Sequence, residues 1–216
     1  KENNIFLFFF FFSHLNTSKP KVKFLSRSIH FCTFIKNYDM KFLIILVLTP
    51  FIMNDFLLFD FNEKTNTREW RIIDDVVMGG ISDGKFKIDE NGNGMFFGRV
   101  STENNGGFSS VRYQMKTKDI NGFSKVSIRL KGDGKNYQFR IKDDINSYYS
   151  YITTFETSGE WETITLNLKD LYPSFRGQTL NLPNFDGKFL EEIVFLIGNK
   201  KDESFELKLD KIELVK

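Results

Sequence analysis

The amino-acid sequence predicts an all-β fold, an antiparallel β-sandwich or jelly roll. Apolar residues alternate with polar ones along many short segments, which is the two-residue period of half-buried strands. Turn-forming clusters such as residues 131–134 and 158–159 separate these segments, and no long helical period accompanies them. Regularly spaced strands with turns between them indicate one sandwich domain.

The first element with a clear signal is a hairpin, in which residues 85–89 and 94–100 flank the Asn-Gly turn of ENGNG. A strand follows at residues 111–115, where Val111, Tyr113 and Met115 share one side. In the last strand the apolar phase shifts, which predicts a bulge near residues 210–211. The remaining strands are expected at residues 126–130, 137–141, 149–155, 164–168, 193–197 and 205–209.

Two glycine pairs stand in related motifs, DDVVMGGISDG at residues 74–84 and STENNGGFSSVR at residues 101–112. A phosphate-binding loop would precede a helix and carry a Lys-Ser/Thr pair. Here a strand pattern follows Gly107. The other Gly-x-Gly, at Gly92 and Gly94, is no dinucleotide fingerprint, because Phe97 occupies the place of its third glycine. We therefore expect Gly79, Gly80, Gly106 and Gly107 to shape loops.

The chain divides at Met53. Residues 1–52 are interpreted as a non-globular upstream or targeting segment, and residues 53–216 as a single β-sandwich domain in the cytoplasm. Two alternatives stay open: Met40 begins a signal-peptide-like stretch without a small-residue cleavage site, and the basic segment before it is similar to a mitochondrial transit peptide. We expect no stable membrane span in the domain.

Composition excludes several classes of function. Both histidines and the single cysteine lie within residues 1–52, so residues 53–216 lack the nucleophile-His pairs and the usual zinc ligands. Residues 1–52 hold 7 of the 30 basic and 2 of the 28 acidic residues, which leaves 23 against 26 and a formal net charge of −3. A slightly acidic domain argues against nucleic-acid binding. No cofactor is expected.

Several motifs occur in a characteristic order: WRIIDDVVMGGISDG, GRVSTENNGGFSSVRY, LKGDGKNYQFRIK, YYSYITTF, YPSFRG and ESFELKLDKIEL. Together they resemble the complex I intermediate-associated protein 30 family over roughly residues 59–214. The resemblance implies a galactose-binding-domain-like jelly roll. For mitochondrial members it also implies a chaperone-like role in assembling respiratory NADH:ubiquinone oxidoreductase.

Strand alternation places Arg112, Arg129 and Arg140 opposite apolar neighbours, so their guanidinium groups point outward. If their strands are adjacent, these groups, Gln138 and a tyrosine of residues 148–151 form a donor surface for carboxylate, phosphate or sugar hydroxyl groups. A solvated face with scattered cations is the alternative. The predicted ligand- or partner-binding residues are Asp75, Asn104, Asn105, Arg112, Arg129, Arg140, Tyr151 and Arg176.

Two other groups are candidates for a site. Trp70 and Trp161 are expected in the core rather than stacked on a sugar ring. The Asp74-Asp75 and Asn104-Asn105 pairs suit turns better than a calcium site, because Asx residues beside glycine commonly hydrogen-bond their own backbone. No metal is expected.

Three functions are compatible with these residues. The first is a non-catalytic binding or assembly module that holds a protein partner, such as a respiratory-complex subunit or assembly intermediate, through its loop end or arginine-bearing face. The second is a glycan or small acidic-ligand binder. The third is a hydrolase with two carboxylates, for which no spacing identifies a pair. We expect a monomeric binding module.

Overall fold

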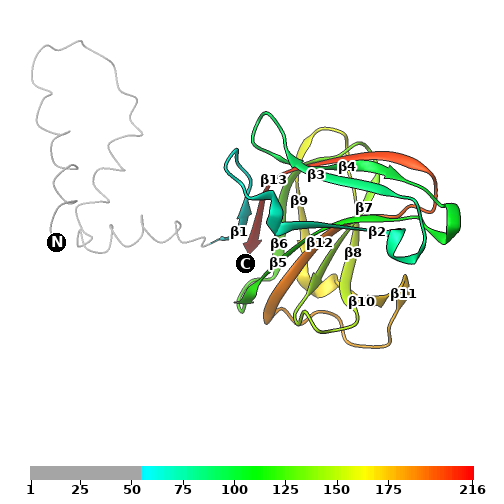
Figure 1. The fold of residues 1–216 in the computed structure, drawn as a ribbon. Coiled ribbons are helices and arrows are strands. Elements are labelled where there is room, and N and C mark those ends of the chain that lie inside the picture. The colour runs from blue at the N-terminus through cyan, green and yellow to red at the C-terminus, as the bar shows by residue number, and fades with distance from the viewer. Residues whose placement is uncertain (1–54) are drawn as a thin grey trace, which may run out of the picture. The chain divides into compact units, whose positions relative to one another are not determined.

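The computed structural model describes residues 55–216, and the predicted segment 1–52 and the boundary at Met53 lie outside these residues. The described chain forms two antiparallel sheets that face each other across one core (Figure 1). This confirms the predicted antiparallel β-sandwich. Within the described residues, no helix is long and apolar enough to cross a membrane.

The first sheet, sheet A, has the strand order β3-β4-β13-β6-β9, and β1 also pairs with β13. The pairing of β13 with β6 shifts register between Leu209 and Lys211, which confirms the predicted bulge. The strands of sheet A are β1 (Phe56–Asp60), β3 (Asp83–Ile88), β4 (Gly94–Val100), β6 (Lys125–Lys131), β9 (Trp161–Asn167) and β13 (Glu203–Val215).

The second sheet, sheet B, has the strand order β11-β10-β8-β7-β12-β5-β2. Its central strand β12 pairs with β5 on one side and β7 on the other, so segments far apart in sequence become neighbours. The strands of sheet B are β2 (Trp70–Asp74), β5 (Ser109–Asp119), β7 (Asn136–Lys142), β8 (Ser150–Glu156), β10 (Tyr172–Phe175), β11 (Gln178–Thr179) and β12 (Phe189–Ile197).

The predicted hairpin is β3-β4. Asp89 follows β3 and accepts hydrogen bonds of 2.9 Å from the backbone N–H groups of Asn91 and Asn93. Gly92 has φ +84°, which glycine adopts without steric cost. Burial raises the pKa of Asp89, but hydrogen bonds from Asn93, Asn91 and Lys208 outweigh that effect and lower it. The Asx residues here serve the turn.

The core lies between the sheets and is rich in aromatic rings. Trp70 is 4% exposed and stacks against Tyr113 and Phe86, with ring centroids 5.1 and 5.4 Å away. Phe139 and Phe195, on neighbouring strands of sheet B, meet in the same core at 5.5 Å. Strands β6 and β7 bury alternate residues, as their two-residue period predicts, whereas the central strand β12 is buried at every residue from Glu192 to Ile197.

Candidate binding face and braced loop end

The loop that follows β2 is held by Asp75, which is fully buried. Its carboxylate accepts hydrogen bonds from the Ser82 N–H (3.0 Å), the Ser82 hydroxyl (2.5 Å), the Gly107 N–H (2.6 Å) and the Phe108 N–H (3.2 Å). Burial alone raises the pKa of Asp75, but these donors outweigh burial and lower it below its ordinary value. The residue therefore joins both glycine-pair loops as a buried anion.

One glycine of each pair is needed because of this carboxylate. A Cβ on Gly80 would lie 2.3 Å from Asp75 Oδ1, and a Cβ on Gly106 would lie 2.6 Å from Asp75 Oδ2. Gly79 has φ +93° and nothing near its missing Cβ, so its role is the backbone turn. The glycines shape loops, as predicted.

The prediction that Asp75 binds a ligand is therefore corrected, because its oxygens already accept four protein donors. Asn104 and Asn105 lie on the surface in left-handed conformations, with φ 55° and 61°. Asp74 likewise accepts from the Gly84 N–H and the Ser109 hydroxyl. Among residues 55–216, no cluster of three or more His, Cys, Asp and Glu side chains could hold a metal ion.

The three predicted arginines do not share one face. Arg129 lies on β6 of sheet A, where its Nε is 2.9 Å from Asp210 and its guanidinium lies 5.5 Å from the ring centroid of Trp161. Arg112 and Arg140 lie on β5 and β7 of sheet B. Trp161 is 37% exposed, so its predicted core position is wrong. Arg129 is separated from Arg140 because β6 and β7, although adjacent in sequence, belong to different sheets.

Arg112 and Arg140 both flank Val194 of β12, in one row that crosses sheet B. Their neighbours Val111 and Phe139 belong to the core, so this row lies on the sheet face that points away from sheet A. The third arginine of the row is Arg71, paired with Arg112. We call this set the arginine row: Arg71, Arg112, Val194, Arg140, Ile152 and Tyr172.

Glu192 lies two residues along β12 on the same face, between Gln114 and Lys142. Its side chain is 2% exposed, and its Oε2 lies 3.7 Å from Arg112 Nη1 but accepts no hydrogen bond in the described structure. Gln114 reaches the other oxygen at 3.4 Å. Buried polar atoms in proteins generally have partners, and the nearest compensation for this oxygen is the positive charge of Arg112.

Arg140 is positioned by its neighbour two residues earlier. Its Nε and one terminal nitrogen donate to Gln138 Oε1, at 3.0 and 2.6 Å. Burial, and to a lesser extent the nearby positive charge of Arg112, lowers the pKa of Arg140 to about 10. The guanidinium stays charged at neutral pH, but it is poorly compensated.

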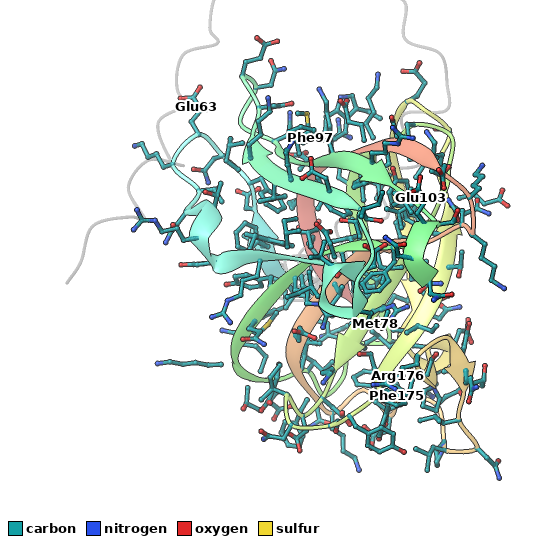
Figure 2. All side chains as sticks on the ribbon, turned by 45° about the vertical axis from the view of Figure 1, so that its right-hand side comes forward. Glu63, Met78, Phe97, Glu103, Phe175 and Arg176 are labelled. Atoms are coloured by element: carbon teal, nitrogen blue, oxygen red, sulfur yellow. The ribbon has the colours of Figure 1, made fainter. Side chains whose placement is uncertain are left out.

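The last two predicted residues lie elsewhere. Tyr151 is 8% exposed and packs in the core against Phe185, with centroids 5.2 Å apart, so the prediction that it joins the arginine face is wrong. Arg176 lies beside Phe175 on the β10-β11 hairpin, with its guanidinium 5.2 Å from that ring (Figure 2). It adds a cation at the edge of sheet B.

The sequence model of the complex I intermediate-associated protein 30 family matches residues 59–209. The chain belongs to this family. Its matched region contains both glycine-pair loops and every strand of the arginine row, so these features lie inside the family domain and not in additions to it.

Solved structures similar to this family member include carbohydrate-binding modules and an agarase. A family 11 carbohydrate-binding module from Clostridium thermocellum, solved with a β-1,3-1,4-mixed-linked tetrasaccharide, has a TM-score of 0.56 and 17% identity over 74% of this chain and 95% of the module. The family 11 module of the cellulase Lic26A-Cel5E of that organism has a TM-score of 0.57 and 17% identity, over 76% of this chain and 95% of the module. The agarase AgWH50C has a TM-score of 0.50 and 13% identity, over 74% of this chain and 24% of the agarase. At these identities the likeness establishes the jelly-roll fold.

Proposed function

We propose that this chain is a non-catalytic binding module that holds a protein partner on the outward face of sheet B, as an assembly factor for respiratory complex I. The family assignment supports the assembly role. The observation that carries the choice of face is the pair Arg112 and Arg140, which lie on either side of Val194 on the face of sheet B that points away from sheet A. Glu192 beside them is 2% exposed and has one arginine, Arg112, within 4 Å, so a second cation of the pair, Arg140, is left without a carboxylate in the described structure.

The surroundings of Glu192 favour binding over hydrolysis. A glycosidase needs two carboxylates facing each other across the scissile bond. The cross-strand neighbours of Glu192 are Gln114 and Lys142, so neither supplies a second carboxylate. Lys142 in turn donates to the backbone carbonyls of Ile145 and Ser147. On the same face Gln138 holds the guanidinium of Arg140, so the face offers donors in fixed positions, which suits recognition.

The test is affinity purification of the tagged chain from its own cells, with the co-purifying proteins identified and quantified by mass spectrometry. Complex I subunits are expected with the wild type and with Arg129→Ala, because Arg129 lies on sheet A. The double variant Arg112→Ala, Arg140→Ala is expected to lose them while keeping its fold by circular dichroism. Equal recovery with the double variant would move the interface elsewhere, and absence of complex I subunits from the wild-type sample would refute the assembly role.

A glycan-binding function is the second candidate. A module with this fold is solved with a mixed-linked tetrasaccharide. Gln138, Arg140 and Tyr172 carry polar groups on the outward face that suit sugar hydroxyls. Calorimetric titration with that tetrasaccharide separates the two functions: saturable binding lost in Arg140→Ala supports the glycan, and no heat at millimolar sugar excludes this ligand.

A further inference from the structure

The arginine row carries three positive charges and no negative one. Arg71, Arg112 and Arg140 are its charged members, and the other three are Val194, Ile152 and Tyr172. Within the described chain, Arg112 has one carboxylate within 4 Å, that of Glu192 at 3.7 Å. Among the ion pairs of residues 55–216, none involves Arg140. The row is therefore an electropositive strip on a domain whose net charge is slightly negative.

The two inner guanidinium groups retain free donors, and that of Arg140 is held in place. Arg140 uses its Nε and one terminal nitrogen on Gln138, which fixes the plane of the group. Arg112 donates its Nε to the Ser110 hydroxyl at 3.4 Å, a long contact. An arginine has five N–H donors in a rigid fork that matches a carboxylate. Donors already ordered by the protein bind an anion with little further loss of side-chain entropy.

We propose that the arginine row binds an acidic side chain of a partner polypeptide, with its carboxylate received between Arg112 and Arg140. This inference rests on the proposed function and names the chemistry of its ligand. The carboxylate would neutralise two cations that lie on either side of Val194. Binding would then relieve the repulsion that the free protein carries, which a neutral ligand does not do.

An exposed aromatic pair lies at the β10 edge of sheet B. Beyond Arg140, the chain before β8 and the strand β10 carry Tyr148 and Phe175, 63% and 38% exposed, with ring centroids 5.3 Å apart. Arg176 covers the Phe175 ring. Exposed Tyr, Phe and Arg are the residues enriched at protein interfaces. These rings add a surface on which side chains of a protein partner could pack.

The probe is a hexaglutamate peptide, acetylated at its N-terminus and amidated at its C-terminus. It is titrated into the purified chain at low salt and followed by NMR shifts of backbone and arginine Nε–H signals. The neutral control is a hexaglutamine peptide with the same caps. We expect the glutamate peptide to shift the signals of Arg112 and Arg140, and its affinity to fall about tenfold or more in Arg112→Gln or Arg140→Gln. Arg129→Gln, an equal loss of charge on sheet A, should leave the affinity within about twofold.

Three results would overturn the proposal. Equal binding of the glutamine peptide would remove the carboxylate from the recognition. An equal loss in all three arginine variants would reduce the effect to net charge, and tighter binding of trigalacturonate than of the peptide would assign the row to an acidic glycan. This titration needs no cellular partner. If the peptide does not bind while complex I subunits still co-purify, the carboxylate site fails alone; if it binds while they do not, the assembly role fails alone.

Discussion

The carboxylate of Asp75 accepts a 2.6 Å hydrogen bond from the backbone N–H of Gly107, 32 residues further along the chain. Through this contact one buried anion joins the loop after β2 to the loop before β5. Both loops contain a glycine that approaches Asp75 too closely for a side chain, Gly80 and Gly106. The paired glycines and the acidic residue upstream thus form a single brace at one end of the sandwich.

Asp75→Asn should therefore lower the free energy of unfolding by about 2–4 kcal/mol, because an amide NH2 would face backbone donors that now reach a carboxylate. Urea denaturation followed by circular dichroism measures the change. The matched control is Asp83→Asn: Asp83 has a 65% exposed side chain paired with Lys85 and should cost about 0.5 kcal/mol or less. Equal costs for the two variants would show that the brace contributes little.

Acid should selectively weaken the same brace. The pKa of Asp75 is lowered in the folded protein, so the native state binds fewer protons than the unfolded state as this group titrates. Its contribution is present above the unfolded pKa of about 4 and is lost as pH falls through the lower folded value. The stability gap between wild type and Asp75→Asn should shrink from pH 7 to pH 3. Comparison with the variant removes the contributions of other acids, and a constant gap would contradict the ionic role.

Two neighbouring glycines should respond differently to alanine. Gly80→Ala places a Cβ 2.3 Å from Asp75 Oδ1, a clash with a buried and fully bonded carboxylate that should cost roughly 2–3 kcal/mol. Gly79→Ala meets nothing within 4 Å, so its cost comes from the left-handed φ of +93° and should be about 1 kcal/mol. Thermal unfolding of both variants tests the order, which reverses if the loop relaxes around Gly80.

The sequence predicts the direction in which a side chain points better than it predicts which strands lie beside its own. Strand alternation correctly turns Arg112 and Arg140 away from the core, because period two is a local property. The prediction that Tyr151 joins the binding residues ignores this period, which puts Tyr151 on the same side as Phe155, the core face. The sheet to which Arg129 belongs is not local, since β6 pairs with β9 and β13 while β7 pairs with β8 and β12.

Two residues of the candidate face have weak signals in the sequence. Glu192 lies within the run LEEIVFLI, where an acidic residue in a buried strand is the only sign of its position. Arg71 precedes Ile72 in the five-residue strand β2, which is too short for its alternation to stand out. Both reach the face through pairings with β5, and such contacts between distant segments follow from the whole topology.

The tryptophans should report the difference between the core and the outer face of sheet A. Trp70 is 4% exposed and packs among Phe59, Phe61, Phe86 and Tyr113, so Trp70→Ala should cost about 3–5 kcal/mol. Trp161→Ala, at a 37% exposed position covered by Arg129, should cost about 1 kcal/mol. Iodide should quench the fluorescence of Trp70→Phe more strongly than that of Trp161→Phe, since the first retains the exposed ring.

Arg112 and Arg140 should repel each other in the free protein. They occupy strands on either side of β12, roughly 10 Å apart at the backbone. At that distance and an effective dielectric of about 20–40, two unit charges repel by about 1 kcal/mol. A double-mutant cycle with Arg112→Gln and Arg140→Gln isolates this contribution from the hydrogen bonds that each arginine makes.

Arg140→Gln should destabilise the Arg112→Gln variant more than the wild type. In the wild type the same substitution also removes the repulsion between Arg140 and Arg112, which offsets part of its cost. Urea denaturation of the four proteins measures the difference. Sodium chloride at 1 M should shrink it, since salt screens the repulsion between the two charges. A coupling of zero or of opposite sign at low salt would mean that Glu192 already neutralises the pair, and the row would then have no unmet demand for an anion.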